Sequence, residues 1–172
     1  LPSSNQSPEE SALSLDELKG KADELTKLLL FLQVHGHNKL NLVIMSKLHG
    51  IDSLTELLKC YGNNLGNDQL LIKIQTNILK TIAICSRHDQ ITSQLLTDPE
   101  NLKNLKYIFD IITEQTSLLK WNDADFLRES LVSDANLLEA CFVVVRQLLI
   151  FNKQQVISQN PQIEQILKST VS

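Results

Sequence analysis

The chain has 172 residues, a length that suits one domain with a buried core. Hydrophobic residues make up 42% and aromatic residues only 5%, so Leu and Ile dominate the apolar content, as in proteins built from helices packed on helices. The net charge of −4 disfavours a general attraction to nucleic acid or to an anionic membrane, and no apolar run approaches the ~18–20 residues of a membrane span.

The N-terminal residues 1–13 are polar, contain two prolines and are expected to form a disordered linker. The first residue is Leu1 rather than Met, so we expect a fragment of a longer chain. Ser14 is placed to cap a helix that continues to about Val34, with Gly36 just beyond its end. Leucines recur along this helix every three or four residues and predict one buried stripe: Leu18, Leu25, Leu28, Leu29 and Leu32.

Two further long helices are predicted downstream. A Gly- and Asn-rich loop over residues 61–68 precedes a helix that runs from about Asp68 to about Ser86, and a third long helix covers residues 137–151. We expect three side chains of these helices to lie in the core: Ile78, Ile82 and Val144. Pro99 and Pro161 stand where a helix begins, because proline fits the first turn but not the interior.

The same order of elements occurs three times. Each copy has a long apolar helix, a polar break, a short helix, a turn and another apolar helix. The polar breaks at Asn38, Asp89 and Asn152 are 51 and 63 residues apart, which indicates an insertion at about residues 114–133. Recurring units of this kind predict an all-α fold, a helical solenoid of about three diverged repeats over residues 14–172.

The order of helices resembles armadillo repeats, and more loosely HEAT-like repeats. Gly50 and Ile51, followed by Leu54, Leu57 and Leu58, resemble the armadillo turn and its next helix, and the run from Ile78 to Cys85 resembles the long helix. The resemblance implies an α-solenoid that binds other proteins. The importin-alpha and beta-catenin families carry a Trp-x-x-x-Asn ladder on successive long helices. In the second copy, Asn77 and Thr81 occupy the positions that match this pair. The pair is not formed, so there is no ladder, and nuclear-import-type peptide capture is not implied.

Metal-binding patterns are incomplete in this sequence. A zinc site needs about four ligands. No Cys or carboxylate stands at a matching spacing beside the histidines, which are His35, His37, His49 and His88. Asp123 and Asp125 suggest a calcium loop, but the required Gly and Glu positions hold Arg128 and Asp134. We therefore expect these acids to cap a helix, and we expect neither a metal nor another cofactor.

No combination of nucleophile, base and orienting group stands out, so we do not expect an enzyme. The chain has three cysteines, Cys60, Cys85 and Cys141. An odd number at wide spacing argues against a disulfide framework and favours a reducing, intracellular compartment, cytoplasmic or nuclear. The segment from Leu54 to Leu58 matches the LxxLL docking pattern, but the same leucines are expected in the core of a repeat.

The insertion contains the candidate partner-binding residues. Trp121 and Phe126 are large aromatic residues outside the repeat frame, and such residues are enriched at binding surfaces. Asp123 and Asp125 lie between them and offer an acidic surface to a basic partner. Alternatively, the two aromatic rings pack the insertion onto the neighbouring repeats.

The sequence therefore predicts a protein–protein interaction scaffold within a larger intracellular regulatory protein or multi-subunit complex. Its partner is expected to be another protein or a peptide, not a membrane. One alternative is a regulatory or exchange-factor domain that clamps a chaperone or a small GTPase. A second alternative is a HEAT-like nucleic-acid-binding module, which needs a basic face. The modest cluster of Lys19, Lys21 and Lys27 is interrupted by acids, so nucleic acid is not the expected partner.

Overall fold

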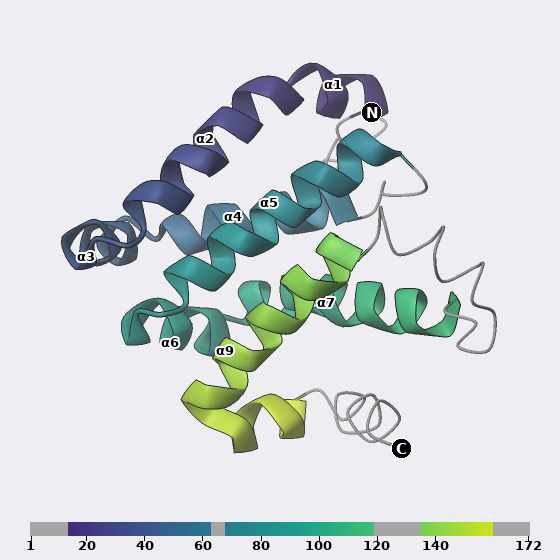
Figure 1. Cartoon of the computed structure of the whole chain (residues 1–172). Helices are drawn as coiled ribbons and strands as arrows, with labels where there is room; N and C mark the ends of the chain where they lie inside the picture. The colour runs from purple at the N-terminus through teal and green to yellow at the C-terminus, as the bar shows by residue number, and fades with distance from the viewer. Residues whose placement is uncertain (1–13, 63–67, 119–134, 160–172) are drawn as a thin grey trace, which may run out of the picture.

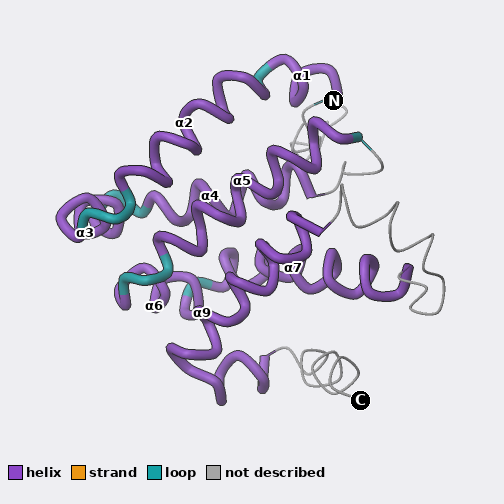
Figure 2. Tube along the Cα trace, in the orientation of Figure 1, coloured by secondary structure: helices purple, strands orange, loops and turns teal. Residues whose placement is uncertain are grey.

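The computed structural model describes residues 14–62, 68–118 and 135–159, which form helices and the turns that join them (Figure 1). No strand occurs within these ranges, as Figure 2 shows. The prediction of an all-α fold is confirmed for this part of the chain. None of the described helices is both long enough and apolar enough to cross a membrane.

The first predicted helix is divided in two. α1 (Leu15–Gly20) begins with a capping box, in which Ser14 Oγ accepts from Glu17 N and Glu17 Oε2 accepts from Ser14 N. α2 (Ala22–His35) starts anew after Lys21 and ends at Gly36, as predicted. Gly20 explains the division, because glycine lowers helix stability relative to alanine.

The remaining helices follow in chain order: α3 (Lys39–Lys47), α4 (Gly50–Gly62), α5 (Gln69–Cys85), α6 (Asp89–Thr97), α7 (Pro99–Leu118) and α9 (Ala135–Gln159). Asn38 and Asp68 cap α3 and α5, because their side-chain oxygens accept hydrogen bonds from first-turn amides. Pro99 begins α7, as predicted.

Three predicted boundaries change in the structure. α4 continues to Gly62, so the first two residues of the predicted loop over residues 61–68 belong to this helix. α7 continues to Leu118, so the first residues of the predicted insertion extend this helix, and residues 119–133 of the insertion lie outside the described part of the chain. α9 is interrupted at Asn152, where φ is −155° and ψ is 85°. The side chain of Asn152 accepts from Gln155 N at 3.1 Å, so the predicted polar break starts a new helical turn.

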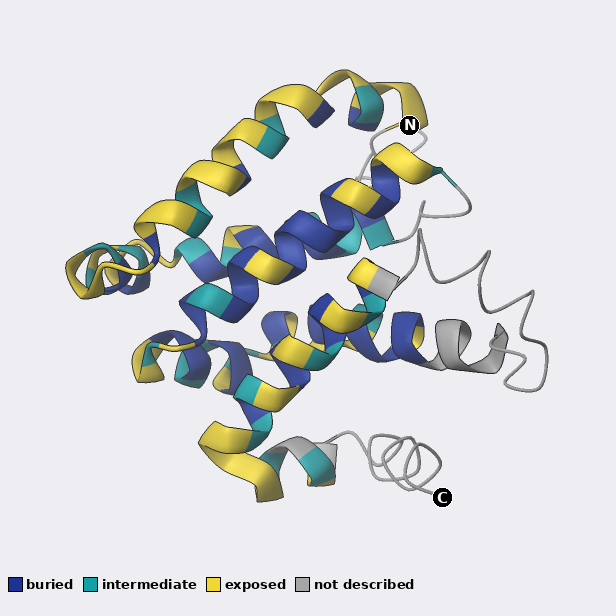
Figure 3. Ribbon diagram, in the orientation of Figure 1, coloured by how far each residue is buried: buried dark blue, intermediate teal, exposed yellow. Residues whose placement is uncertain are grey.

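α5 is the central helix of the fold. It packs against α2, α4 and α9, and most of its ribbon is buried in Figure 3. Ile78 and Ile82 on α5, and Val144 on α9, have no exposed surface, which confirms their predicted place in the core. The buried polar side chains of α5 are mostly paired, although Gln75 Oε1 has no hydrogen-bond partner among the described residues. Gln75 Nε2 donates to the carbonyl oxygen of Leu58 on α4 at 3.1 Å.

Two successive groups of three helices have the same layout. We call α2, α3 and α4 the first unit and α5, α6 and α7 the second unit. The helices α3 and α6 begin 50 residues apart, at Lys39 and Asp89, and α2 and α5 also end 50 residues apart. The residue that matches Asn38 is therefore His88 rather than Asp89. Helix α2 packs on α5, α3 on α6, and α4 on α7, so the first unit covers one side of the second.

The predicted leucine stripe of the first helix is only partly buried. Leu18 and Leu29 are buried, and Leu25 and Leu32 are partly exposed. The prediction was wrong for Leu28, whose surface is 53% exposed. Among the described helices, α2 packs chiefly against α1 and α5, which leaves the side chain of Leu28 on an uncovered surface.

Neighbouring leucines of α2 should therefore respond differently to truncation. Leu29→Ala should lower the free energy of unfolding by about 2–5 kcal/mol, because it opens a cavity in the core. Leu28→Ala should change the free energy of unfolding by less than about 0.5 kcal/mol, as at other exposed positions. Urea unfolding followed by circular dichroism measures both values. Equal losses for the two variants would contradict the described orientation of α2.

Candidate interaction surface

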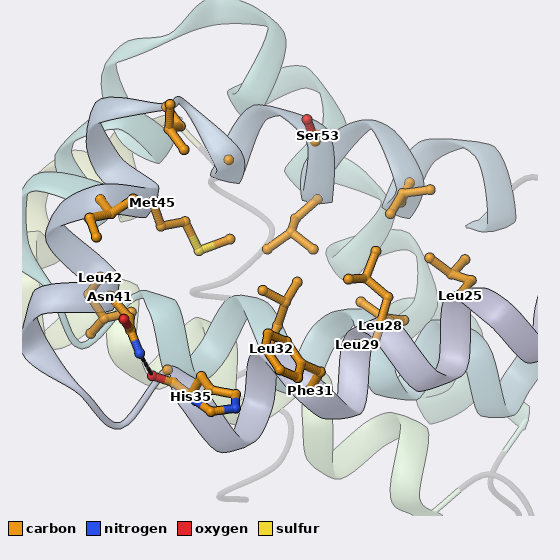
Figure 4. Close-up of a pocket in the computed structure, with 16 residues that line it drawn as sticks. Leu25, Leu28, Leu29, Phe31, Leu32, His35, Asn41, Leu42, Met45 and Ser53 are labelled. Atoms are coloured by element: carbon orange, nitrogen blue, oxygen red, sulfur yellow. Dashed lines mark hydrogen bonds between the residues drawn. The ribbon is translucent and has the colours of Figure 1, made fainter.

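An apolar groove lies between α2 and α4, with α3 at one end (Figure 4). Its volume is about 470 Å³. We call it the first-unit groove, and its apolar lining consists of Leu25, Leu28, Leu29, Phe31, Leu32, Leu42, Ile44, Met45, Leu48, Leu54 and Leu57. Polar lining residues are few, so the groove offers a surface for apolar side chains.

Several large side chains of the first-unit groove are exposed. The exposed fractions are 53% for Leu28, 58% for Phe31, 47% for Ile44 and 75% for Leu48. Single exposed apolar side chains are common on proteins, but a contiguous set of them marks a site of interaction. The first-unit groove is therefore the candidate site of this chain.

The end of the groove is fixed by close contacts. Asn41 Nδ2 donates to the carbonyl oxygen of His35 at 3.0 Å, which joins α3 to the end of α2 (Figure 4). His49 has a φ of 52° in the turn before α4. A Cβ on Gly50 would lie 2.8 Å from Cγ of Met45, so glycine allows α4 to start directly against α3.

The stretch from Leu25 to Ile51 supplies most of the groove and carries basic groups but no acidic ones, whereas α4 carries Asp52 and Glu56 beside its lining residues. No Asp or Glu occurs between Glu24 and Asp52, although the whole chain has a net charge of −4. Lys27, Lys39 and Lys47 lie within this stretch and are exposed. Three of the four histidines also belong to it. The α3 side of the groove is thus the more basic side.

The groove was not predicted from the sequence, because the leucines of α2 were expected to form a single buried stripe. One signal was present in the sequence. The run from Leu28 to Leu32 is apolar at five consecutive positions, so it places apolar side chains on every side of the helix. Such a helix needs cover on more than one side.

The predicted partner-binding residues lie outside the described residues. Trp121, Asp123, Asp125 and Phe126 all belong to residues 119–134. Their role in binding stays a prediction.

The positions that match the armadillo Asn ladder are engaged within the fold. Gln33 Nε2 donates to Asn77 Oδ1 and to Thr81 Oγ1, both at 3.3 Å. These two polar side chains of α5 are therefore hydrogen-bonded to α2. Thr81 Oγ1 in turn donates to the carbonyl oxygen of Asn77 at 2.8 Å. These contacts join the two units and leave Asn77 only 9% exposed.

Other sequence motifs take structural roles. Leu54 and Leu58 of the LxxLL pattern are buried, which confirms that they belong to the core. His37 Nδ1 lies 3.3 Å from Arg87 Nη1, and His49 lies beside Asp52. Within the ranges that the structure describes, no three His, Cys, Asp or Glu side chains come together to hold a metal ion.

The cysteines are placed differently with respect to solvent. Cys85 and Cys141 are buried, and Cys60 is partly exposed. Burial raises the pKa of the Cys85 thiol to about 11 and raises the pKa of Cys141 further. Both buried thiols are therefore protonated near neutral pH, and a protonated thiol is a poor nucleophile.

Comparisons with protein-family models, with curated proteins and with solved structures found no match to this chain.

The burial of the thiols predicts their reactivity. At pH 8, iodoacetamide should modify Cys60 in the folded chain well before Cys85 and Cys141, because the buried thiols are inaccessible and their pKa is raised. In 8 M urea all three should react at similar rates. Mass spectrometry of peptides after timed quenching measures each site. Rapid modification of Cys141 in the folded chain would contradict its place in the core.

Proposed function

We propose that this chain is a protein-interaction domain, an armadillo-like α-solenoid of about three repeats. It serves as a scaffold within a larger intracellular regulatory protein or complex. The proposal is supported chiefly by the first-unit groove, where exposed apolar side chains of α2 and α3 are contiguous. Burial of such side chains against a partner stabilises a complex by about 25 cal/mol per Å² of apolar surface, before the costs of association.

The position of the groove also supports a scaffold role. The groove is formed by backbone elements that are held from the opposite side. α2 and α4 both pack on α5, and α3 is linked to α6 through Gln94 Nε2, which donates to the carbonyl oxygen of Ser46 at 3.0 Å. A surface that is supported in this way is preorganised, so a partner does not have to order it on binding.

A comparison of variants in affinity capture tests the proposal. The immobilised 172-residue chain should retain one or more proteins from a cell extract, and Leu28→Asp with Ile44→Asp should lose at least one of them. Both positions are about half exposed, so the double variant should keep its helical circular dichroism spectrum.

Val34→Asp is the matched control for this capture. Val34 lies on α2 and is 69% exposed, but it does not line the groove. This variant should retain the same proteins as the unmodified chain. Identical capture by all three chains, as read by quantitative mass spectrometry, would refute the groove as the binding surface.

A further inference from the structure

The first-unit groove is the open counterpart of a site that is filled in the second unit. Helix α4 packs on both α5 and α7. A shift of 50 residues relates α5 and α7 to α2 and α4, which are the two walls of the first-unit groove. The place that α4 occupies on the second unit is therefore uncovered, among the described residues, on the first.

Matched positions show the difference in burial. Leu28 is 53% exposed, whereas its counterpart Ile78 is fully buried. Met45 and Leu32 are partly exposed, whereas their counterparts, Leu95 and Ile82, are fully buried. The first unit thus presents apolar side chains at positions that a neighbouring helix covers in the second unit.

The second unit holds α4 partly through polar contacts. Gln75 Nε2 donates to the carbonyl oxygen of Leu58, and Asn101 Nδ2 donates to Asp52 Oδ1 at 2.7 Å. The Thr55 hydroxyl lies 2.6 Å from Asn101 Oδ1.

These polar contacts have no counterpart in the first unit. Leu25 stands at the position that matches Gln75, and Ile51 at the position that matches Asn101. An occupant of the first-unit groove therefore gains from a more apolar face than that of α4, because apolar side chains bury more apolar surface against an apolar lining.

The charges indicate the direction of the occupant. The first turn of α4 lies over the start of α7, because Asp52 accepts from Asn101 there. The matching place on the first unit is the start of α4 beside α3. Lys39 and Lys47 are exposed at the two ends of α3, and His49 is exposed before α4, where it lies 3.6 Å from Asp52 Oδ2. Acidic residues in the first turn of a docked helix would meet these groups and would also favour its helix dipole.

We propose that the first-unit groove binds a single amphipathic helix of a partner protein, seated as α4 is seated on α5 and α7. The inference rests on the proposed interaction function and specifies the partner. Its buried face is apolar at positions three and four residues apart, and its first turn carries acidic residues that lie beside α3.

A peptide of residues 50–62 of this chain is the probe, because it is the helix that fills the matching site. Cys60→Lys, joined to Glu56 by a lactam, holds the short peptide helical and removes its thiol; a free helix of this length is marginal in water. Fluorescence anisotropy of the labelled peptide should show saturable binding to the full chain. A peptide with Leu58→Asp should bind at least about tenfold more weakly, because Leu58 is fully buried where α4 is seated.

Variants of the chain locate the binding site. Phe31→Asp should weaken binding of the probe at least about tenfold, because its ring lines the groove and is 58% exposed. Val34→Asp, on the same helix but outside the groove, should leave the affinity unchanged. Circular dichroism and the urea midpoint verify that both variants are folded.

Two changes in the probe test its chemistry. Thr55→Leu should tighten binding, because leucine buries more apolar surface than threonine in a groove that has no Asn101. Asp52→Lys should weaken binding to the unmodified chain by about two- to fivefold, the range for exposed ion pairs. A chain with Lys39→Glu and Lys47→Glu should instead prefer the Asp52→Lys peptide.

Three results would overturn the inference. One is the absence of saturable binding by the probe and by its Thr55→Leu form. Another is an equal effect of Phe31→Asp and Val34→Asp. The third is a dimer of the unmodified chain, seen by sedimentation velocity and abolished by Phe31→Asp, because a second copy would then be the occupant. If the capture experiment succeeds while the probe fails, the interaction function stands and the helical partner is rejected.

Discussion

The structure depends on the burial of α5 on nearly all of its sides. Polar side chains on a helix in that position need partners, because an unpaired one costs free energy in the interior, and most of those on α5 have them. Gln75 donates to α4, and Asn77 and Thr81 accept from Gln33 of α2. These bonds tie both neighbours to the central helix in one register. α2 and α4, the walls of the first-unit groove, are consequently held in place by their contacts with α5.

The two units share a layout but differ in what covers them. The second unit lies beneath the first, and buried polar residues such as Gln75 and Asn101 hold the covering helix. The first unit has Leu25 and Ile51 at these positions and carries exposed leucines beside them. Buried hydrogen bonds suit a contact that forms once, as the chain folds, whereas an open apolar groove suits a partner that binds from outside.

Sequence reasoning succeeded where local rules decide the structure. The cap at Ser14, the helix starts near Asp68 and at Pro99 and the break at Asn152 follow from hydrogen bonding and backbone geometry within a few residues. The candidate site was harder to find. Leu28 and Leu29 are adjacent and chemically identical, and periodicity alone assigned both to the buried stripe. Only the placement of α5 against one side of α2 separates the exposed residue from the buried one.

The amino-acid sequence by itself determined the all-helical class and the central apolar helix, because hydrophobic period and capping act locally. It also contained the repeat and the acid-free stretch between Glu24 and Asp52. The tertiary structure decided which apolar side chains are covered. It paired Asn77 with Gln33, joined the first unit to one side of the second, and left the groove of α2 and α4 open. Those outcomes depend on contacts between residues about 40 to 50 positions apart, and such contacts do not follow from the pattern of any single helix.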